Sequence, residues 1–436
     1  MAPRSGEVFL ALNHEPGHPS WRRDLSGETG ADRSRADASP SSGLRANPVR
    51  RCAVRALGAF SAIRQASRES GRPVRELFAE AIGLRLGIGR LGLLEYLDYR
   101  LYLNDLDAEQ KSAFGGWRAQ QLLERLLVDD YSRFLSLDKL TMYALMRGLG
   151  FPIPELRAVY GLTRPQSFTN LGSPEALADY LQDGRNLPVY LKPAFGAYGR
   201  GNTLILGVEG DQLRLGDGSS VSVRSFCESL NSRASLGWLL QQPLCSHPDL
   251  AEVCGDKISS VRIHTFLGAG GPEVVSALLK VNAGAQDCDN FRHGESGNLL
   301  GALDIATGRV TRVVSGTGST QKLVEQHPRS GKCLIDLQLP AWQAVVALAL
   351  DAQLAFPGYL CPGWDIAICP DGPKILEVNY FGDIDLPQHA YRRGFLDDKL
   401  IALMKSRGLD LASSGESACS RFLRLNGRSR LRVWPW

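Results

Sequence analysis

Three oxygen-bearing side chains near the C-terminus are spaced so that one β-hairpin can bring them together. Asp365 lies in an apolar run, and Glu377 and Asn379 follow beyond a turn sequence at 370–373. Residues two apart on a strand point to the same face, so Glu377 and Asn379 can project together, and the hairpin can bring Asp365 beside them. Two carboxylates and an amide oxygen suit Mg²⁺ holding a nucleotide polyphosphate. A surface hairpin with solvated acids is equally compatible with this segment alone.

A second segment, well upstream, combines a lysine with a glycine-rich loop. Lys192 ends a short apolar strand, and Gly196, Gly199 and Gly201 follow before another apolar run. Glycines let backbone N–H groups approach phosphate oxygens, and Lys192 would add a positive charge. The segment has no P-loop sequence, and the strand after the glycines argues against a Rossmann turn. A glycine-rich hairpin without a ligand is the alternative interpretation.

A third segment is a helix with a lysine in its first turn. Ser136 is the expected N-cap, Gly150 follows the last helical residue, and Pro152 prevents continuation. Lys139 lies where the helix dipole mildly disfavours a cation, a placement that a nearby anion would explain. A solvated lysine is the common alternative.

In this order, the three segments resemble the motifs of the ATP-grasp superfamily. They read DKLTMYALMRGLGFPIP, YLKPAFGAYGRGN and WDIAICPDGPKILEVN, and the resemblance covers roughly residues 131–400. It implies an α+β ATP-grasp fold, in which two α+β subdomains grip ATP between antiparallel sheets. It also implies ATP and Mg²⁺ as cofactors, with Mn²⁺ as an alternative. By this resemblance the phosphate-binding residues are Lys139, Lys192 and the flap glycines, and the metal ligands are Asp365, Glu377 and Asn379.

The resemblance extends to the segment between the flap and the hairpin. Gln241, Gln242 and Leu244 match the strand and hinge that receive adenine, although many relatives carry an acid where Gln242 stands. Arg262, on an alternating strand over 258–267 that also carries His264, matches a position that holds phosphate or a substrate carboxylate. A bidentate guanidinium suits both anions, and a structural salt bridge is equally compatible. Lys280, on the next strand, is expected to face the same cleft, and we predict catalytic roles for both cations.

Further motifs resemble one branch of the superfamily. LEYLDYRLY at 94–102, VRIHT at 261–265 and Asp289-Asn290-Phe291 are similar to the sugar-transfer-associated ATP-grasp proteins, near the α-L-glutamate-ligase-like group. That branch is bacterial and often associated with polysaccharide or cell-envelope gene sets. Relatives tend to follow Asp-Asn-Phe with two glycines, whereas residues 292–298 intervene here. Because of this departure, the resemblance assigns no substrate to the loop on the acceptor side.

The composition is that of a globular protein without a strong charge signal. The chain has 436 residues, enough for two or three domains, with 44% apolar and 22% charged residues. A net charge of +4 is too small to argue for nucleic acid. Nine cysteines without C-x-x-C pairs indicate neither a zinc site nor a disulfide scaffold, so we expect a reducing cytoplasm. The histidines His247, His264, His293 and His327 share no metal-binding spacing, and His293 is of interest because it lies in the acceptor-side loop.

The expected organisation has four parts. Residues 50–90 form a basic amphipathic helical stretch that can touch an anionic membrane surface, although a helical domain packed on the core is favoured. We therefore expect a cytoplasmic protein that can associate peripherally with the inner membrane. The predicted parts are a disordered basic extension (1–50), a helical region (51–130), an ATP-grasp domain (131–400, divided into 131–245 and 246–400) and a basic tail (401–436).

These observations predict an ATP- and Mg²⁺-dependent ligase that joins a carboxylate to an amine through an acylphosphate. The expected substrates are small molecules, saccharides or peptides, in polysaccharide or cell-envelope biosynthesis, and the expected partners include a membrane or glycan-assembly component but no nucleic acid. Two alternatives stay open: a phosphotransferase acting on a sugar or carrier hydroxyl, and a nucleotide-binding module without turnover. No nucleophile-elbow sequence supports a hydrolase triad.

Overall fold

The computed structural model describes residues 48–162, 168–195, 201–231 and 237–411. The chain divides into two compact units, Met1–Gln65 and Ala66–Trp436. The described part of the first unit belongs to helix α1 (Pro48–Ser70), and all other elements lie in the second unit. The four-part division expected from the sequence stays a prediction. None of the described helices is long and apolar enough to cross a membrane.

Helices dominate the described chain up to residue 148. The helical periodicity predicted over 50–90 is confirmed by α1 and α2. The elements after α1 are α2 (Val74–Leu86), α3 (Leu93–Asp98), α4 (Ala108–Ser112), α5 (Trp117–Leu127), α6 (Asp130–Leu137) and α7 (Lys139–Gly148).

Helix α7 begins and ends as its local sequence dictates, with one correction. The expected N-cap, Ser136, is wrong: it lies inside α6 and its hydroxyl donates to the Arg133 carbonyl. Asp138 caps α7 instead, because its carboxylate accepts from the Thr141 N–H at 3.2 Å. Gly150 follows the helix with a φ of 81°, as the sequence predicted for a residue that must be left-handed.

The first sheet has seven strands in the order β2-β1-β7-β3-β4-β5-β6. Helices α8 (Pro174–Gln182) and α9 (Val223–Asn231) pack against one face of it, where Leu177 and Phe226 join the sheet's apolar core. Helix α7 covers part of the other face through Leu140 and Tyr143. The strands are β1 (Leu156–Tyr160), β2 (Thr169–Leu171), β3 (Val189–Pro193), β4 (Thr203–Glu209), β5 (Gln212–Leu215), β6 (Ser220–Ser222) and β7 (Trp238–Gln241).

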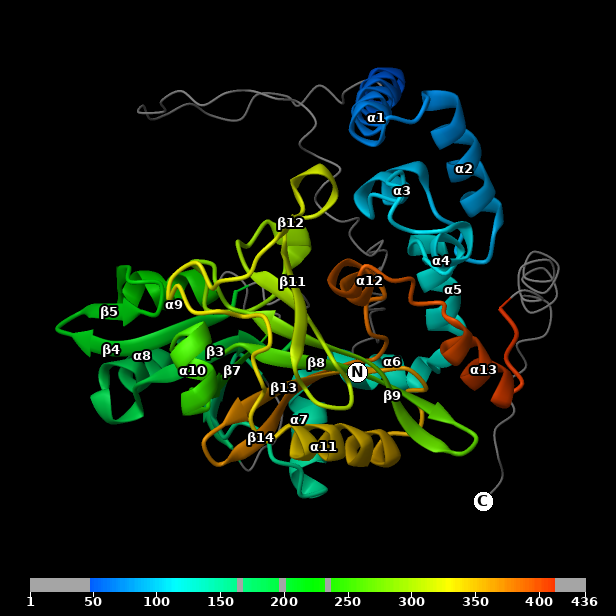
Figure 1. Ribbon diagram of the computed structural model, residues 1–436. Helices are drawn as coiled ribbons and strands as arrows, with labels where there is room; N and C mark the ends of the chain where they lie inside the picture. The colour runs from blue at the N-terminus through cyan, green and yellow to red at the C-terminus, as the bar shows by residue number, and fades with distance from the viewer. Residues whose placement is uncertain (1–47, 163–167, 196–200, 232–236, 412–436) are drawn as a thin grey trace, which may run out of the picture. The chain divides into compact units, whose positions relative to one another are not determined.

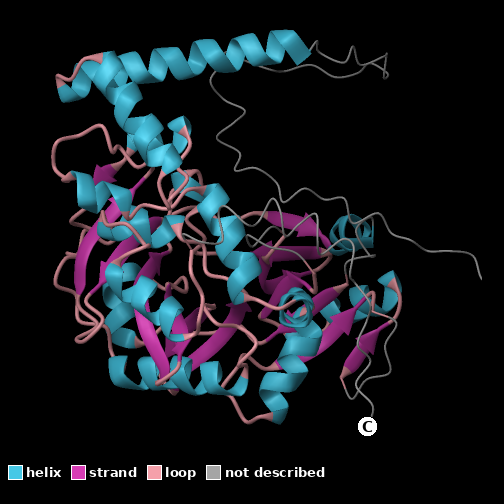
Figure 2. Cartoon of the chain, turned by 90° about the vertical axis from the view of Figure 1, so that its right-hand side faces the viewer, coloured by secondary structure: helices cyan, strands magenta, loops and turns pink. Residues whose placement is uncertain are grey.

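The second sheet also has seven strands, in the order β12-β11-β10-β9-β8-β13-β14, and the two sheets form separate groups of strands (Figures 1 and 2). The remaining helices are α10 (Pro248–Cys254), α11 (Trp342–Ala355), α12 (Asp385–Tyr391) and α13 (Asp398–Ser406). The strands are β8 (Ser260–Gly268), β9 (Gly271–Val281), β10 (Leu299–Leu303), β11 (Val310–Ser315), β12 (Lys322–Leu323), β13 (Gly363–Cys369) and β14 (Gly372–Asn379).

The two faces of the second sheet differ in chemistry. Ile263, Leu279 and Trp364 point to one face and pack with Ala349 of α11 in the largest core cluster. Residues of the alternate register point to the opposite face, on whose side α12 lies (Figure 1). Because side chains alternate along a strand, the polar residues between these apolar ones share that opposite face.

Strands β13 and β14 form the hairpin predicted from the sequence. Asp365 lies opposite Glu377, and Asn379 lies opposite Gly363. A register shift after Asp365 leaves Leu376 as an extra residue on β14. The hairpin therefore places Asp365, Glu377 and Asn379 on one face of the sheet.

Candidate functional site

A cavity of ≈ 270 Å³ lies between the two sheets. Tyr190, Lys192, Leu204 and Gln241 line it from the first sheet, and Lys280, Asp365 and Glu377 line it from the second. Basic and acidic side chains therefore meet in one cavity, as a polyanion bound together with a cation requires.

Alternation along β3 explains which residues of the first sheet reach the cavity. Val189 and Leu191 join the core beneath α8 and α9, so Tyr190 and Lys192 point the other way. Lys139 reaches the same cavity from the first turn of α7, whose start is tied to the end of β3 by a 3.0 Å hydrogen bond from the Lys139 N–H to the Ala194 carbonyl.

Lys192 is half-buried, and its surroundings lower the pKa of its ammonium. Its ammonium donates to the Leu376 carbonyl on the second sheet at 3.3 Å. Burial lowers the pKa of Lys192 to about 8; the nearby Glu377 carboxylate opposes this shift, and Lys139 reinforces it. Since Lys139 and Lys192 line the same cavity, an anion between their ammonium groups would be stabilised by both.

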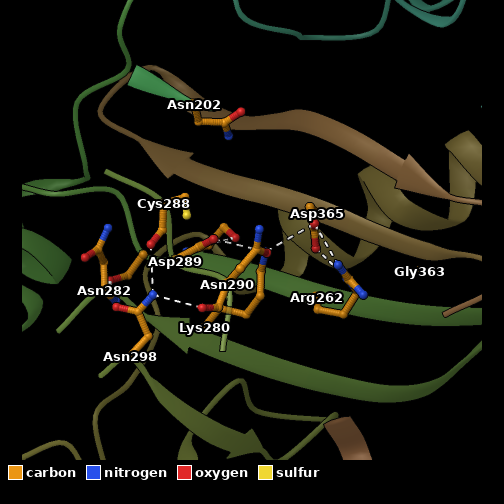
Figure 3. Close-up of polar contacts among 12 residues, drawn as sticks. Asn202, Arg262, Lys280, Asn282, Cys288, Asp289, Asn290, Asn298, Gly363 and Asp365 are labelled. Atoms are coloured by element: carbon orange, nitrogen blue, oxygen red, sulfur yellow. Dashed lines mark hydrogen bonds and ion pairs between the residues drawn. The ribbon is translucent and has the colours of Figure 1, made fainter. Parts of the chain in front are cut away.

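A chain of buried ion pairs occupies the polar face of the second sheet (Figure 3). Arg262 contacts both carboxylate oxygens of Asp365, with Nη2 at 2.8 Å from Oδ2. Lys280 lies 3.1 Å from Asp365 and 3.1 Å from Asp289, and Asp289 also accepts from the Ser260 N–H at 2.8 Å. Two cations and two anions thus alternate, so that each buried charge has a partner of opposite sign.

These contacts fix the protonation states on this face. Burial alone would raise the pKa of the Asp365 carboxyl, but Arg262 and Lys280 hold it well below its usual range. Burial opposes the charge on Lys280, yet Asp289 and Asp365 raise the pKa of its ammonium. Burial lowers the pKa of His264 on the same face to about 3, so its imidazole stays neutral. The face therefore carries fixed charges at neutral pH.

The three predicted metal ligands differ in how much of their coordinating capacity is free. Glu377 is half-buried at the cavity, and its carboxylate has no hydrogen bond or ion pair among the described residues. Asn379 donates its amide N–H to the Gly363 carbonyl at 3.3 Å, which leaves its side-chain oxygen available. Asp365 uses both oxygens on Arg262 and Lys280. Oxygen donors of this kind fit Mg²⁺, and Glu377 fits it best.

The hinge predicted to receive adenine is a loop after β7. Gln241 is buried, and Gln242, Pro243 and Leu244 line the cavity. The Gln242 N–H donates to the Glu155 carbonyl at 2.8 Å, so it is engaged within the protein. The Leu244 N–H has no acceptor within the part of the chain that the structure describes. Leu244 is therefore the better placed of the two backbone donors to meet a purine edge.

The loop at 285–290 contributes Asp287, Cys288, Asp289 and Asn290 to the lining of the cavity. Asn298 fixes this loop by donating to the Cys288 and Asn290 carbonyls at 2.8 and 3.0 Å (Figure 3). Asp287 then contacts the first sheet, where its carboxylate accepts from the Leu204 N–H at 3.3 Å. The two sheets are thus joined across the cavity both here and at Lys192.

The structure brings most of the sequence-predicted site residues to one cavity, although not all. Arg262 and Asn379 are absent from its lining, and Arg262 acts behind Asp365. Gly201 lines a second cavity with Asn202 and Asp287. Gly196 and Gly199 lie outside the described residues. The residues in the lining are Lys139, Lys192, Gln241, Gln242, Leu244, Lys280, Asp365 and Glu377.

Sequence reasoning missed several residues of the cavity. Tyr190 had a usable signal, because it lies two residues before Lys192 on the same strand and must share its face. Asp289 appeared only as part of a motif, and its pairing with Lys280 depends on a loop path that spacing does not reveal. Asp287 and Asn298 likewise act through contacts across the fold.

The chain belongs to the sugar-transfer associated ATP-grasp family, whose family model matches residues 120–401. The fold, the order of the motifs and the cavity between two antiparallel-rich sheets agree with that membership. The ATP-grasp fold expected from the sequence is therefore confirmed. No curated protein matches the chain.

Solved structures with a related fold are distant in sequence. The chain is similar to a D-alanine-D-alanine ligase from Coxiella burnetii (13% identity, 71% of this chain, 68% of that chain, TM-score 0.36). It is also similar to a biotin carboxylase from Campylobacter jejuni (13% identity, 62% of this chain, 46% of that chain, TM-score 0.36). A third similar structure is that of the ATP-grasp ligase PsnB complexed with a phosphomimetic variant of the minimal precursor, Mg and ADP (15% identity, 66% of this chain, 68% of that chain, TM-score 0.33). The chain thus spans about half the length of the biotin carboxylase.

We expect the charge of Asp365 to be required for stability. Asp365→Asn leaves Arg262 facing a neutral amide and removes one partner of Lys280, so it should lower the free energy of unfolding by about 3–5 kcal/mol, measured by urea denaturation. The control is Asp371→Asn in the same hairpin, whose exposed pair with Lys374 should contribute less than about 1 kcal/mol. Equal effects of the two substitutions would contradict the charge-pairing argument.

We expect nucleotide affinity to fall at alkaline pH through Lys192. ATP binds the protonated ammonium, whose pKa is about 8 without ligand, so binding is strongest below that value and weakens above it. Kd should rise about tenfold between roughly pH 7 and roughly pH 9, measured by calorimetry. In Lys192→Arg the guanidinium stays charged and Kd should be nearly constant over this range. An equal rise in both proteins would assign the titration to another group.

Proposed function

We propose that this chain is an ATP- and Mg²⁺-dependent ligase that joins a carboxylate to an amine. The observation that carries the proposal is the single cavity with Lys139 and Lys192 on one side and Glu377 on the other. Lysines neutralise phosphate oxygens, while a carboxylate opposite them can hold only a cation. A polyphosphate with its metal ion satisfies both sides at once.

Each residue then has a distinct role in binding. Lys139 and Lys192 neutralise the phosphates, and Leu244 offers its N–H to the purine. Glu377 and Asn379 hold the metal ion through oxygen, and Asp365 has its oxygens committed to Arg262 and Lys280 while still bordering the cavity. Mg²⁺, when bound, supplies charge neutralisation between the phosphate oxygens.

The proposed reaction proceeds in two balanced steps. A carboxylate oxygen attacks the γ-phosphorus of ATP, the bond to the bridging oxygen breaks, and ADP leaves with that electron pair. The amine nitrogen then attacks the acyl carbon, inorganic phosphate leaves, and the amine loses a proton to solvent. Lys280 lines the cavity where it can stabilise negative charge, and Arg262 positions it indirectly through Asp365. No covalent bond to the protein is needed.

The family and the loop beside the cavity support a proposal for the chemical class of the substrates. We place the reaction in the biosynthesis of a polysaccharide or cell-envelope component because the family is described as sugar-transfer associated. The substrates would be a small molecule, saccharide or peptide that carries a carboxylate, and a second that carries an amine. The loop at 285–298 would select them, since Asn298 holds it at the cavity.

We expect Glu377→Ala to abolish most metal-dependent turnover. Loss of a ligand removes part of the several kcal/mol that a metal ion contributes, so ADP release should fall by about 100-fold or more. The assay follows ADP and the amide product over a panel of carboxylates and amines. The control, Glu252→Ala, removes an exposed acid that pairs with Lys332 and does not line the cavity, and should leave the rate unchanged.

The products separate the candidate functions. Undiminished activity of Glu377→Ala would contradict the site assignment. A phosphorylated acceptor without an amide would replace the ligase by a phosphotransferase. Nucleotide binding without ADP release for every acceptor would replace it by a binding module.

A further inference from the structure

A second group of potential metal ligands lies apart from the nucleotide cavity. Asp98, at the end of α3, His293, in the short helix η4 (Arg292–Gly294), and His389, in α12, each present a ligand atom, and these atoms lie within 4.8 Å of one another. Among the described residues this is the group of three such side chains that can hold a metal ion. None of the three lines the nucleotide cavity.

Each of the two imidazoles has a buried ring nitrogen that faces a carboxylate. His389 is buried, and its Nε2 lies 3.2 Å from an Asp98 oxygen; His293 Nδ1 lies 3.5 Å from an Asp385 oxygen. Both nitrogens are buried atoms. Imidazole nitrogens and carboxylate oxygens that face one another in a buried cluster can bind a metal ion in common.

The surrounding contacts hold the cluster in place. Gln321 lies 3.3 Å from His389 Nδ1, the ring nitrogen that faces away from Asp98, and Tyr99 packs on the same ring with centroids 4.8 Å apart. The Gln321 atom in this contact is the amide nitrogen, which donates to Nδ1 and leaves the proton on Nε2 facing Asp98. Exchanging the amide oxygen and nitrogen of Gln321 lets it accept the Nδ1–H instead, and Nε2 then has the lone pair that a metal ion needs.

His293 is held in a conformation that its residue type rarely adopts. Its φ is 52°, and the preceding Arg292 has a φ of 47°. Such left-handed backbone costs about 1–3 kcal/mol and is found where the surrounding structure enforces it, commonly at functional sites. The next residue, Gly294, lies so close to the backbone of Gly316 that a Cβ there would be 2.4 Å from the Gly316 Cα. The loop is therefore closely packed where it brings His293 near Asp98.

We propose that Asp98, His293 and His389 bind a divalent first-row transition ion of the Zn²⁺ class. Two imidazoles with one carboxylate favour such an ion over Mg²⁺ or Ca²⁺, which prefer oxygen ligands only. Asp385 is close enough to His293 to supply a fourth oxygen. Zn–N distances of about 2.0–2.1 Å place ligand atoms of a tetrahedral site about 3.3 Å apart, so each needs to move by about 1 Å or less.

The site joins three segments that the chain order keeps far apart, and this suggests what the ion does. It would fix α3 and α12 to the loop at 292–298, which follows directly on the loop that lines the nucleotide cavity. The ion is thus structural for the acceptor side of the protein and separate from the ion proposed beside ATP. The inference does not depend on the ligase reaction.

The test is metal binding by the full-length protein. Bound metal is first removed with a chelator, and Zn²⁺ or Co²⁺ is then added back. We expect one equivalent of Zn²⁺ to be retained after desalting, measured by mass spectrometry, and Co²⁺ to give the visible absorption of a tetrahedral N/O site. Loss of a residue that only hydrogen-bonds to a metal ligand lowers metal affinity about 10–100-fold, so loss of a ligand itself in His293→Gln or His389→Gln should lower Zn²⁺ affinity by about 100-fold or more.

Matched controls separate this site from other binders. His327→Gln changes a buried histidine whose Nε2 is also a buried atom but which belongs to no such group, and it should retain Zn²⁺. Glu377→Ala should also retain it, even where ATP turnover is lost. Folded wild-type protein that retains no Zn²⁺ and gives no Co²⁺ bands would overturn the proposal. Retention of Zn²⁺ by both histidine variants would also overturn it. Release of Zn²⁺ when the exposed thiols of Cys245 and Cys333 are blocked would do the same.

Discussion

Burial of four charged groups on one face of the second sheet is the constraint on which the rest of the site depends. Each ion would cost several kcal/mol to bury alone, so Arg262, Lys280, Asp365 and Asp289 must lie in alternating contact. The strand register supplies part of this order, since Asp365 is paired directly with Arg262 across β8 and β13. Asp289, the remaining member, draws its loop onto the sheet, and that loop forms a wall of the cavity.

The same charge balance leaves Glu377 as the acid with spare coordinating capacity. Asp365 is in direct contact with two cations, whereas Glu377 has only the longer-range attraction of Lys192, Arg262 and Lys280 among the described residues. Lys192 of the first sheet and Lys139 of α7 line the same cavity as Glu377. The arrangement therefore separates two functions of acidic residues: one organises the cations of the sheet, and the other stays available for a metal ion and the phosphates it accompanies.

Local signals in the sequence are sufficient to predict the strands and the turn that carry the site. The alternation around Lys192 and Glu377 and the turn at 370–373 gave the strands and their faces, because period and turn chemistry act over a few residues. The N-cap was misplaced at Ser136 because both Ser136 and Asp138 can cap a helix, and the break between α6 and α7 is set by packing. The partnership of Arg262 with Asp365 joins residues 103 positions apart, and no local pattern encodes it.

The histidine cluster shows the same limit more strongly. His293 was noted only for its place in a divergent loop, and His389 and Asp98 lie on helices far from it in the sequence. Metal-ligand spacing is visible in a sequence when two ligands share a turn or a helix, and here Asp98, His293 and His389 come from three different segments. Only Asp385 shares a helix with one of them, four residues before His389 in α12. The loop that departs from the family pattern is thus the one that carries a ligand.

Binding of Mg²⁺-ATP, measured by calorimetry on the wild-type protein and on Lys192→Ala, tests the central claim most directly. The account predicts metal-dependent binding by the wild type that is weakened strongly in the variant, because the buried ammonium faces the acids of the second sheet across the phosphate site. Wild-type protein that binds no nucleotide, or a variant that binds it as tightly, would contradict the assignment of this cavity as the nucleotide site.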